Sequence, residues 1–236
     1  MRIGIDMGHT LNPANYGAIG IKNESEETRA VGKKLIGYLE CMGNKVVDVT
    51  VDYANSKSES LRERVAKANA QPLDFFVSLH FNAFDGKRNG SEIYTYRGKR
   101  LPQAVRVLDN LSKLGFKNNG IFDGSKLYVI KKTKAPAMLV EIAYIDSPID
   151  MKIYNDDLVA RAIAEGITGQ KIPQKCLRIN EDDKIVEQDD IERCDCGNGI
   201  YRVVVGGAQS YESAVKCAWG LKELGYIVAM EKIEEI

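Results

Sequence analysis

Two histidines are the residues whose type and position most favour chemistry in this sequence. The chain has 236 residues and only these two histidines, His9 and His80. Each follows a short apolar run that predicts a β-strand, and the carboxyl ends of strands are where open α/β sheets build their sites. Neutral imidazole is a favoured zinc ligand, and a catalytic zinc ion takes three protein ligands. We therefore expect both histidines to bind one metal ion.

The third ligand is expected to be an acidic residue. Glu24 is a candidate because it opens a predicted helix shortly after the loop that His9 begins. Glu26 and Glu27 are equally placed by spacing, and Asp6 is nearer to His9 but lies within a predicted strand. Acidic residues also favour the N-terminus of a helix through its dipole, with no role in metal binding. Spacing alone therefore leaves the choice open.

Glu141 is a candidate acid/base. It interrupts an apolar run at residues 137–143 that predicts a buried strand. A carboxylate in such a strand is costly to bury unless it is paired or hydrogen-bonded. Partial burial raises the pKa of a carboxyl group, which suits a general base that works near neutral pH.

The elements that must position these residues alternate between strands and helices. Strands are predicted at residues 2–6, 45–51, 74–80, 91–96, 126–131 and 137–142, and helices at 24–42, 58–69, 101–114 and 147–166. This alternation predicts an α/β fold with an open, twisted, mostly parallel sheet covered by helices. After residue 199 a smaller strand–helix–strand module is predicted, which is too small to bury a convincing core alone.

Composition and net charge limit the kinds of partner that this protein is expected to have. Apolar residues make up 44% and charged residues 28% of the chain, which is typical of a globular protein. The net charge is zero, so we expect no nucleic-acid partner. We expect no membrane partner either, because no window approaches the roughly 18 apolar residues of a membrane helix. The first residues lack the apolar stretch of a secretory signal, which predicts synthesis in the cytoplasm.

Charge and cysteine content set the C-terminal part of the chain apart. From residue 174 onward there are 8 basic and 13 acidic residues, although the whole chain is balanced. We predict a catalytic domain at 1–173, an acidic linker at 174–198 and a small module at 199–236. Without a signal peptide, all the cysteines are expected to be reduced thiols. They are Cys41, Cys176, Cys194, Cys196 and Cys217.

Several segments in order along residues 1–172 resemble the motifs of one known enzyme family. Two of them resemble the first two metal motifs: residues 5–9 (IDMGH), and 16–20 (YGAIG) followed by Glu24. Residues 60–64 (SLRER) with 68–69 (AN), then 76–83 (FVSLHFNA), resemble the stretch before the third metal motif and that motif itself. Residues 139–145 (LVEIAYI) resemble the strand that carries the catalytic glutamate. Together these segments resemble the zinc-dependent N-acetylmuramoyl-L-alanine amidases of the sporulation and phage endolysin type. One position departs from the pattern, because Thr10 stands where the family usually has glycine.

The resemblance implies a set of roles and a substrate. His9, Glu24 and His80 would hold one Zn²⁺ ion, and Glu141 would be the catalytic acid/base. The substrate would be peptidoglycan, cleaved at the amide between N-acetylmuramic acid and L-alanine of the stem peptide during cell lysis. The alternatives are a zinc peptidase that cuts within the stem peptide and a catalytically inactive wall-binding protein.

The C-terminal module carries a second resemblance. Residues 201–210 (YRVVVGGAQS) and 224–226 (LGY) resemble half of a SPOR domain, a class of domain that binds peptidoglycan glycan strands. A half-module implies a homodimer in which two copies complete one glycan-binding sheet. The predicted synthesis in the cytoplasm, together with these resemblances, implies a protein that acts on the cell wall after release.

Overall fold

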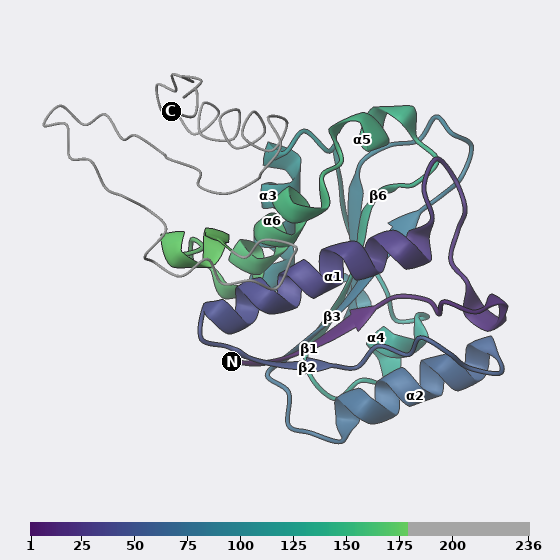
Figure 1. The fold of residues 1–236 in the computed structure, drawn as a ribbon. Helices are drawn as coiled ribbons and strands as arrows, with labels where there is room; N and C mark the ends of the chain where they lie inside the picture. The colour runs from purple at the N-terminus through teal and green to yellow at the C-terminus, as the bar shows by residue number, and fades with distance from the viewer. Residues whose placement is uncertain (179–236) are drawn as a thin grey trace, which may run out of the picture. The chain divides into compact units, whose positions relative to one another are not determined.

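The computed structural model describes residues 1–178, which are built around one six-stranded sheet (Figure 1). Its strands are β1 (Arg2–Met7), β2 (Lys45–Asp48), β3 (Phe75–Asn82), β4 (Ser91–Thr95), β5 (Asn118–Asp123) and β6 (Ala137–Tyr144). The strand order is β2-β1-β3-β6-β4-β5, and every neighbouring pair is parallel except β4 with β6. The predicted α/β class with a mostly parallel sheet is confirmed.

Helices cover both faces of this sheet (Figure 1). They are α1 (Glu24–Cys41), α2 (Lys57–Asn69), α3 (Pro102–Lys113), α4 (Tyr128–Lys132), α5 (Pro148–Ile153) and α6 (Asp156–Thr168). Helix α6 packs against both α1 and α3 over the larger hydrophobic core, and α2 and α4 enclose a smaller one. The 3-10 helices are η1 (Pro13–Asn15), η2 (Tyr96–Gly98) and η3 (Gln174–Arg178).

Side chains along β3 alternate between the two cores, as the pleat of a strand requires. Phe75, Val77 and Leu79 belong to the larger core under α1, whereas Phe76 belongs to the smaller core. His80 is four residues beyond Phe76 and therefore lies on the α2/α4 face of the sheet. The alternation thus decides on which face the site is built.

One predicted strand is a helix in the structure, and one observed strand was not predicted. Residues 126–131 were expected to form a strand, but Tyr128–Lys132 is α4, whose Val129 and Ile130 are buried in the smaller core. A short apolar run fits a buried helix as well as a strand. The edge strand β5 (Asn118–Asp123) was not expected, because its Asn-Asn-Gly start is typical of a turn; it pairs in parallel with β4.

The helix predicted at residues 147–166 is in fact two helices. Asn155 lies between α5 and α6 in an extended conformation, and its side chain accepts a hydrogen bond from the Leu158 backbone N–H at 2.9 Å. This is an N-cap, and it starts a new helix. Ser147 caps the first helix in the same way, through the backbone N–H of Asp150.

The expectation of reduced thiols is wrong for one pair of cysteines. Cys41 and Cys176 form a disulfide, with their Cα atoms 5.8 Å apart, although 135 residues separate them in the sequence. Cys41 is the last residue of α1 and Cys176 is buried within η3. The bond ties η3 to the end of α1. Cys194, Cys196 and Cys217 lie outside the described residues.

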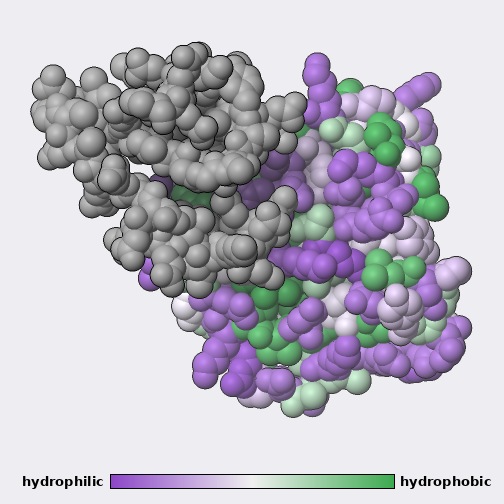
Figure 2. All heavy atoms as spheres, in the orientation of Figure 1, coloured by the Kyte–Doolittle hydropathy of each residue, from purple (hydrophilic) through white to green (hydrophobic). Residues whose placement is uncertain are grey.

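Within residues 1–178 no helix has both the length and the apolar composition needed to cross a membrane. Hydrophilic side chains dominate the face shown in Figure 2, with separate hydrophobic patches between them. The most exposed large apolar side chains of the described part are Ile19, Tyr53 and Phe84, at 73%, 72% and 66%.

Candidate active site

The two histidines meet because their strands are neighbours in the sheet. Strand β1 pairs in parallel with β3, with Met7 opposite Leu79, and the Gly8 backbone N–H donates to the Leu79 carbonyl at 2.9 Å. The rings of His9 and His80 lie edge to face, with centroids 4.7 Å apart. A Cβ atom on Gly8 would come within 2.5 Å of the His80 ring and of the Leu79 carbonyl oxygen. Only glycine permits this approach.

Glu24, the first residue of α1, lies between the two imidazoles. Its Oε1 is 3.1 Å from His9 Nε2 and 3.1 Å from His80 Nδ1. The backbone N–H of Phe81 also donates to Oε1, at 3.0 Å, and that of Ala18 donates to Oε2 at 2.8 Å. These bonds hold the carboxylate rigidly. One possible ligand atom from each of these three residues lies within 4.8 Å of the other two.

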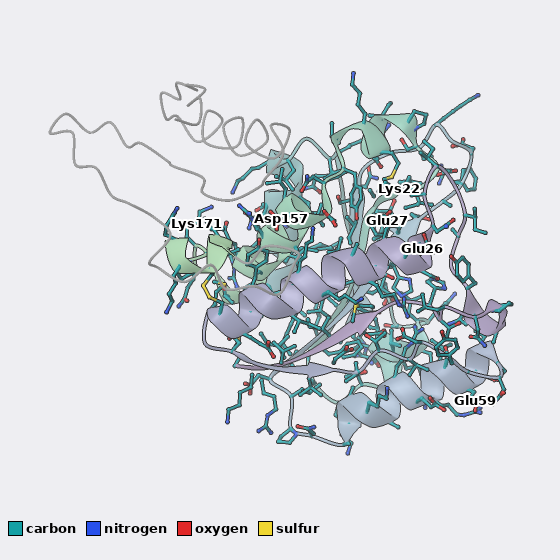
Figure 3. The ribbon with its side chains drawn as sticks, viewed as in Figure 1. Lys22, Glu26, Glu27, Glu59, Asp157 and Lys171 are labelled. Atoms are coloured by element: carbon teal, nitrogen blue, oxygen red, sulfur yellow. A yellow bond between two sulfur atoms is a disulfide. The ribbon has the colours of Figure 1, made fainter. Side chains whose placement is uncertain are left out.

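The other acidic candidates have different partners. Glu26 accepts hydrogen bonds from Tyr16 and Asn23, and Glu27 binds Lys22 at 2.8 Å. Figure 3 shows Lys22, Glu26 and Glu27 together near the start of α1. Asp6 is fully buried beneath the site. It accepts a hydrogen bond from Ser78 at 2.7 Å, and its other oxygen lies 3.4 Å from Arg64 Nε.

The electrostatics of this group favour metal-binding protonation states. Burial opposes ionisation of Glu24, but hydrogen bonds from His80 and His9 outweigh it and lower the pKa of Glu24 below its usual range. Burial lowers the pKa of His80, which favours its neutral form. A metal ion needs the ionised carboxylate and the neutral imidazole, so both groups are ready to bind one near neutral pH.

The backbone at His9 is unusual and is held by the loop that follows it. His9 has a φ of 65°, in the left-handed region that costs a non-glycine residue roughly 1–2 kcal/mol. Its Nδ1 lies 3.2 Å from the Asn15 carbonyl oxygen, and a proton on Nδ1 would leave Nε2 free to bind a metal ion. Thr10, the departure from the family pattern, accepts a hydrogen bond from the Asn15 backbone N–H and is fully buried. Its hydroxyl therefore supports the loop.

Glu141 lies beside His80 on the neighbouring strand. In the parallel pairing of β3 with β6, His80 is the partner of Glu141, so both side chains lie on the same face of the sheet. Glu141 Oε2 is buried and accepts no hydrogen bond from any residue in the described part of the chain. Burial, with the negative charges of Glu24 and Glu92, raises the pKa of Glu141 well above its ordinary value.

Glu92 is a further acidic residue of the site, and the sequence did not single it out. It lies opposite Glu141 in the antiparallel pairing of β4 with β6. Its carboxylate is buried and accepts hydrogen bonds from Tyr144 at 2.7 Å and from Tyr94 at 2.9 Å. The strand at 91–96 was predicted, but the identity of its neighbour was not. Without that neighbour, nothing in the sequence connects Glu92 with Glu141.

A family model for amidase type 3, described as N-acetylmuramoyl-L-alanine amidase, matches residues 3–169. The chain belongs to this amidase family. The match encloses the two histidines, Glu24 and Glu141, and ends within the described residues.

Relatives of this member of the amidase family include bacterial and phage proteins. An uncharacterised protein of Clostridium perfringens is 36% identical over 80% of the chain and 58% of its own length. The N-acetylmuramoyl-L-alanine amidase LytC of Bacillus subtilis is 34% identical over 70% of the chain and 34% of its own length. The endolysin of Bacillus phage SPP1 is 31% identical over 70% of the chain and 62% of its own length. The chain thus spans about a third to three fifths of these relatives.

Solved structures agree with the amidase fold. The catalytic domain of the CD27L endolysin, which targets Clostridia difficile, superposes with a TM-score of 0.68 and 28% identity, covering 73% of this chain and 99% of that one. The catalytic domain of CwlV, an N-acetylmuramoyl-L-alanine amidase of Paenibacillus polymyxa, gives a TM-score of 0.62 and 28% identity, covering 71% and 96%.

Proposed function

We propose that this protein is a zinc-dependent peptidoglycan hydrolase that cleaves the amide between N-acetylmuramic acid and L-alanine of the stem peptide. The observation that carries the proposal is the convergence of His9 Nε2, Glu24 Oε1 and His80 Nδ1, with Glu141 on the next strand. Membership of the amidase family and the names of the relatives support the choice of bond.

The residues present fit a zinc ion. Two imidazole nitrogens and one carboxylate oxygen form a donor set that catalytic zinc commonly uses, with a fourth position left open. Ligands on a tetrahedral zinc ion with bonds near 2.0 Å are roughly 3.3 Å apart. The measured 3.1 Å from Glu24 Oε1 to each histidine nitrogen is close to that spacing. His9, Glu24 and His80 would hold the ion.

The reaction needs an activated water molecule and a protonated leaving group. A zinc ion bound here would polarise the scissile carbonyl group, lower the pKa of a water molecule and stabilise charge on the carbonyl oxygen. Glu141 would take the proton from that water through Oε2, the oxygen left without a hydrogen bond, and pass it to the departing amide nitrogen. Its raised pKa makes the protonated form accessible, as proton delivery requires.

The loops around the site would form the walls of an open groove for the polymer. Residues 10–22 and 81–90 would supply these walls. They approach a common segment, since Ile21 N–H donates to the Ile145 carbonyl at 3.0 Å and Phe84 N–H donates to Asp146 at 2.9 Å. Ile21 and Phe84 are 56% and 66% exposed there. Exposed apolar side chains beside a site are suited to contact a substrate.

The remaining assignments concern the whole protein. We propose that residues 1–173 form the catalytic domain, with an acidic linker at 174–198 and a glycan-binding module resembling half of a SPOR domain at 199–236. Pairing of two such modules would give a homodimer. The protein would be made in the cytoplasm and act on the cell wall after release. Residues 179–236 lie outside the described part of the chain.

Replacing Gly8 by alanine tests how closely the two histidine strands must approach. The new Cβ would lie 2.5 Å from the His80 ring and from the Leu79 carbonyl oxygen. Backbone atoms cannot move aside as the end of a flexible side chain can. We expect Gly8→Ala to weaken zinc binding by about 10-fold or more. Competition with a chromophoric chelator measures the zinc dissociation constant.

Gly4→Ala, within β1, is the matched control. Its Cβ would meet the flexible end of Leu73 at 2.6 Å, away from the site, so zinc affinity should stay as in the unmodified protein. Unchanged zinc affinity in Gly8→Ala would show that the close approach is not required.

Mass analysis of the fragments released from purified cell walls tests the proposed bond. An amidase frees an intact stem peptide that begins with L-alanine, and a chelator should abolish this release. Peptides cut internally would instead indicate a zinc peptidase. Binding to walls without new amino groups would indicate an inactive wall-binding protein. Either of these results would contradict the proposal.

A further inference from the structure

Two buried arginines converge on the backbone of His9. Arg29 Nη2 donates to the His9 carbonyl at 2.9 Å, and Arg64 Nη2 donates to the same oxygen. Arg29 Nη1 also donates to the carbonyl of Gly8. Arg29 is 7% exposed and Arg64 is 1% exposed. Two full positive charges are thus placed on one short stretch of backbone.

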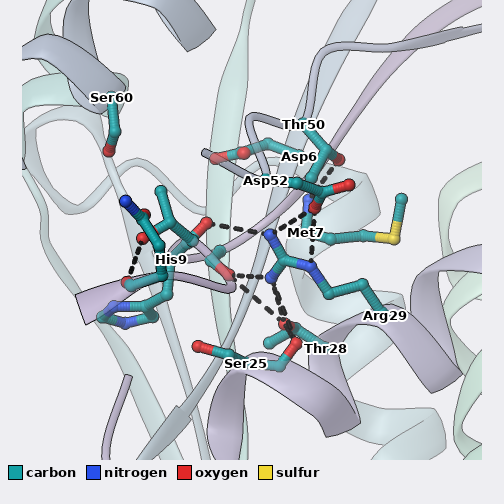
Figure 4. A network of polar contacts seen from close by, with 12 residues as sticks. Asp6, Met7, His9, Ser25, Thr28, Arg29, Thr50, Asp52 and Ser60 are labelled. Carbon is teal, nitrogen blue, oxygen red and sulfur yellow. Dashed lines mark hydrogen bonds and ion pairs between the residues drawn. The ribbon is translucent and has the colours of Figure 1, made fainter. Parts of the chain in front are cut away.

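Each arginine forms an ion pair with an aspartate, and Arg29 is also hydrogen-bonded to its own. Arg29 Nε and Nη2 lie 3.1 and 3.0 Å from Asp52 Oδ1, as Figure 4 shows, and Arg64 Nε lies 3.4 Å from Asp6 Oδ1. A planar guanidinium group that binds a carboxylate along one edge presents its remaining N–H groups in fixed directions. Asp52 therefore aims Arg29 at the carbonyl of His9, and the charge of Asp6 stabilises the buried guanidinium group of Arg64 beside it.

The backbone that they bind needs such support. His9 has the left-handed φ of 65°, which a non-glycine residue rarely adopts. Hydrogen bonds to the carbonyl of His9 fix the peptide plane that follows it, and those to Gly8 fix the plane before it. With both planes fixed, the Cα–Cβ bond of His9 has one direction, and the imidazole faces Glu24.

The same arginines tie the helices to the end of β1. Arg29 lies in α1, five residues after Glu24, and also donates to the Ser25 carbonyl at 3.2 Å. Arg64 lies in α2, on the opposite face of the sheet. The two sides of the fold are thus joined at His9, and the position of His9 relative to Glu24 is set by one side chain of α1.

We propose that Arg29 and Arg64 are positioning residues, an arginine clamp that sets zinc affinity by holding His9 in its left-handed conformation. The proposal rests on the proposed function, because it concerns the same zinc site. Neither arginine has an atom among the ligand set of His9, Glu24 and His80. The clamp would act through the His9 backbone alone.

The test is the zinc dissociation constant of Arg29→Lys and Arg64→Lys in the 236-residue chain. Lysine keeps the charge but offers one ammonium group in place of the planar fork, so it cannot hold carboxylate and carbonyl in the same geometry. Loss of a group that orients a metal ligand typically weakens metal binding by about 10- to 100-fold. We expect a loss in this range for each variant, measured by chelator competition on folded, zinc-free protein.

Arg106→Lys is the matched control. Arg106 also binds main-chain carbonyls, those of Gly166 at 2.8 Å and Ile167 at 3.2 Å, but at the end of α6. We expect Arg106→Lys to lower the melting temperature of the zinc-free protein and to leave the zinc dissociation constant unchanged. A merely structural role for Arg29 and Arg64 would give the same pattern as this control, and would overturn the proposal.

The outcomes distinguish a failure of the proposed clamp from a failure of the proposed zinc site. Zinc binding that is absent in the unmodified protein, or that survives His80→Ala, would contradict the proposed function. Zinc binding that depends on His80 and is unchanged in Arg29→Lys would contradict the clamp alone. If Arg64→Lys does not fold, the zinc dissociation constant of Arg29→Lys alone tests the clamp. The Asp52 side chain is 49% exposed, so weakening its ion pair with Arg29 does not leave a buried charge without a partner.

Discussion

Glu141→Gln is expected to lose most cell-wall hydrolysis while zinc stays bound. Glutamine has nearly the same shape but cannot take up and release a proton, and general acid–base catalysis typically contributes about 10²- to 10⁴-fold. Glu141 is on β6 and is not among the residues of the metal cluster, so the ligands stay in place. The release of new amino groups from purified walls measures the rate, and elemental analysis measures the zinc.

Glu165→Gln is the control for this change of charge. Glu165 lies in α6 and pairs with Lys171 at 2.7 Å, so hydrolysis should continue at the rate of the unmodified protein. Full activity of Glu141→Gln with zinc bound would eliminate Glu141 as the acid/base.

His80→Ala should lose the metal ion. Its Nδ1 is one of the three proposed ligand atoms, and the chain has no third histidine to replace it. We expect zinc to fall from about one ion per chain to a small fraction, with hydrolysis lost in parallel. Elemental analysis after gel filtration gives the metal content, and circular dichroism shows whether the variant is folded.

Glu26→Ala is the control for metal loss. Its carboxylate accepts hydrogen bonds from Tyr16 and Asn23 and is not part of the cluster, so zinc should remain. About one zinc ion per chain in His80→Ala would show that the ligand assignment is wrong.

The framework of the site was predictable because it depends on local patterns. The strands at residues 2–6, 74–80 and 137–142 are apolar runs with clear ends, and all three form neighbouring strands of the sheet. Placing His9 and His80 at the ends of two such strands was sufficient to predict that they meet. The choice of Glu24 over Glu26 and Glu27 came from the family resemblance, because all three have the same helical setting.

The features that could not be predicted from the sequence depend on contacts between distant residues. Glu92 joins the site only because β4 runs antiparallel to β6, and a sequence pattern does not state which strands pair. In the sequence, Arg29 and Arg64 are basic residues of two predicted helices. Only the fold brings both to the carbonyl of His9. The disulfide likewise links two cysteines that are 135 residues apart. Local patterns place elements, whereas tertiary packing selects these partners.

The most direct test of the zinc site is a crystal structure of the zinc-loaded protein with anomalous data collected at the zinc absorption edge. We predict a single anomalous peak bonded to His9 Nε2, Glu24 Oε1 and His80 Nδ1 at about 2.0–2.2 Å. The carboxyl group of Glu141 should face the open fourth position. A zinc peak elsewhere, or histidine rings too far apart to bind the same ion, would contradict the account.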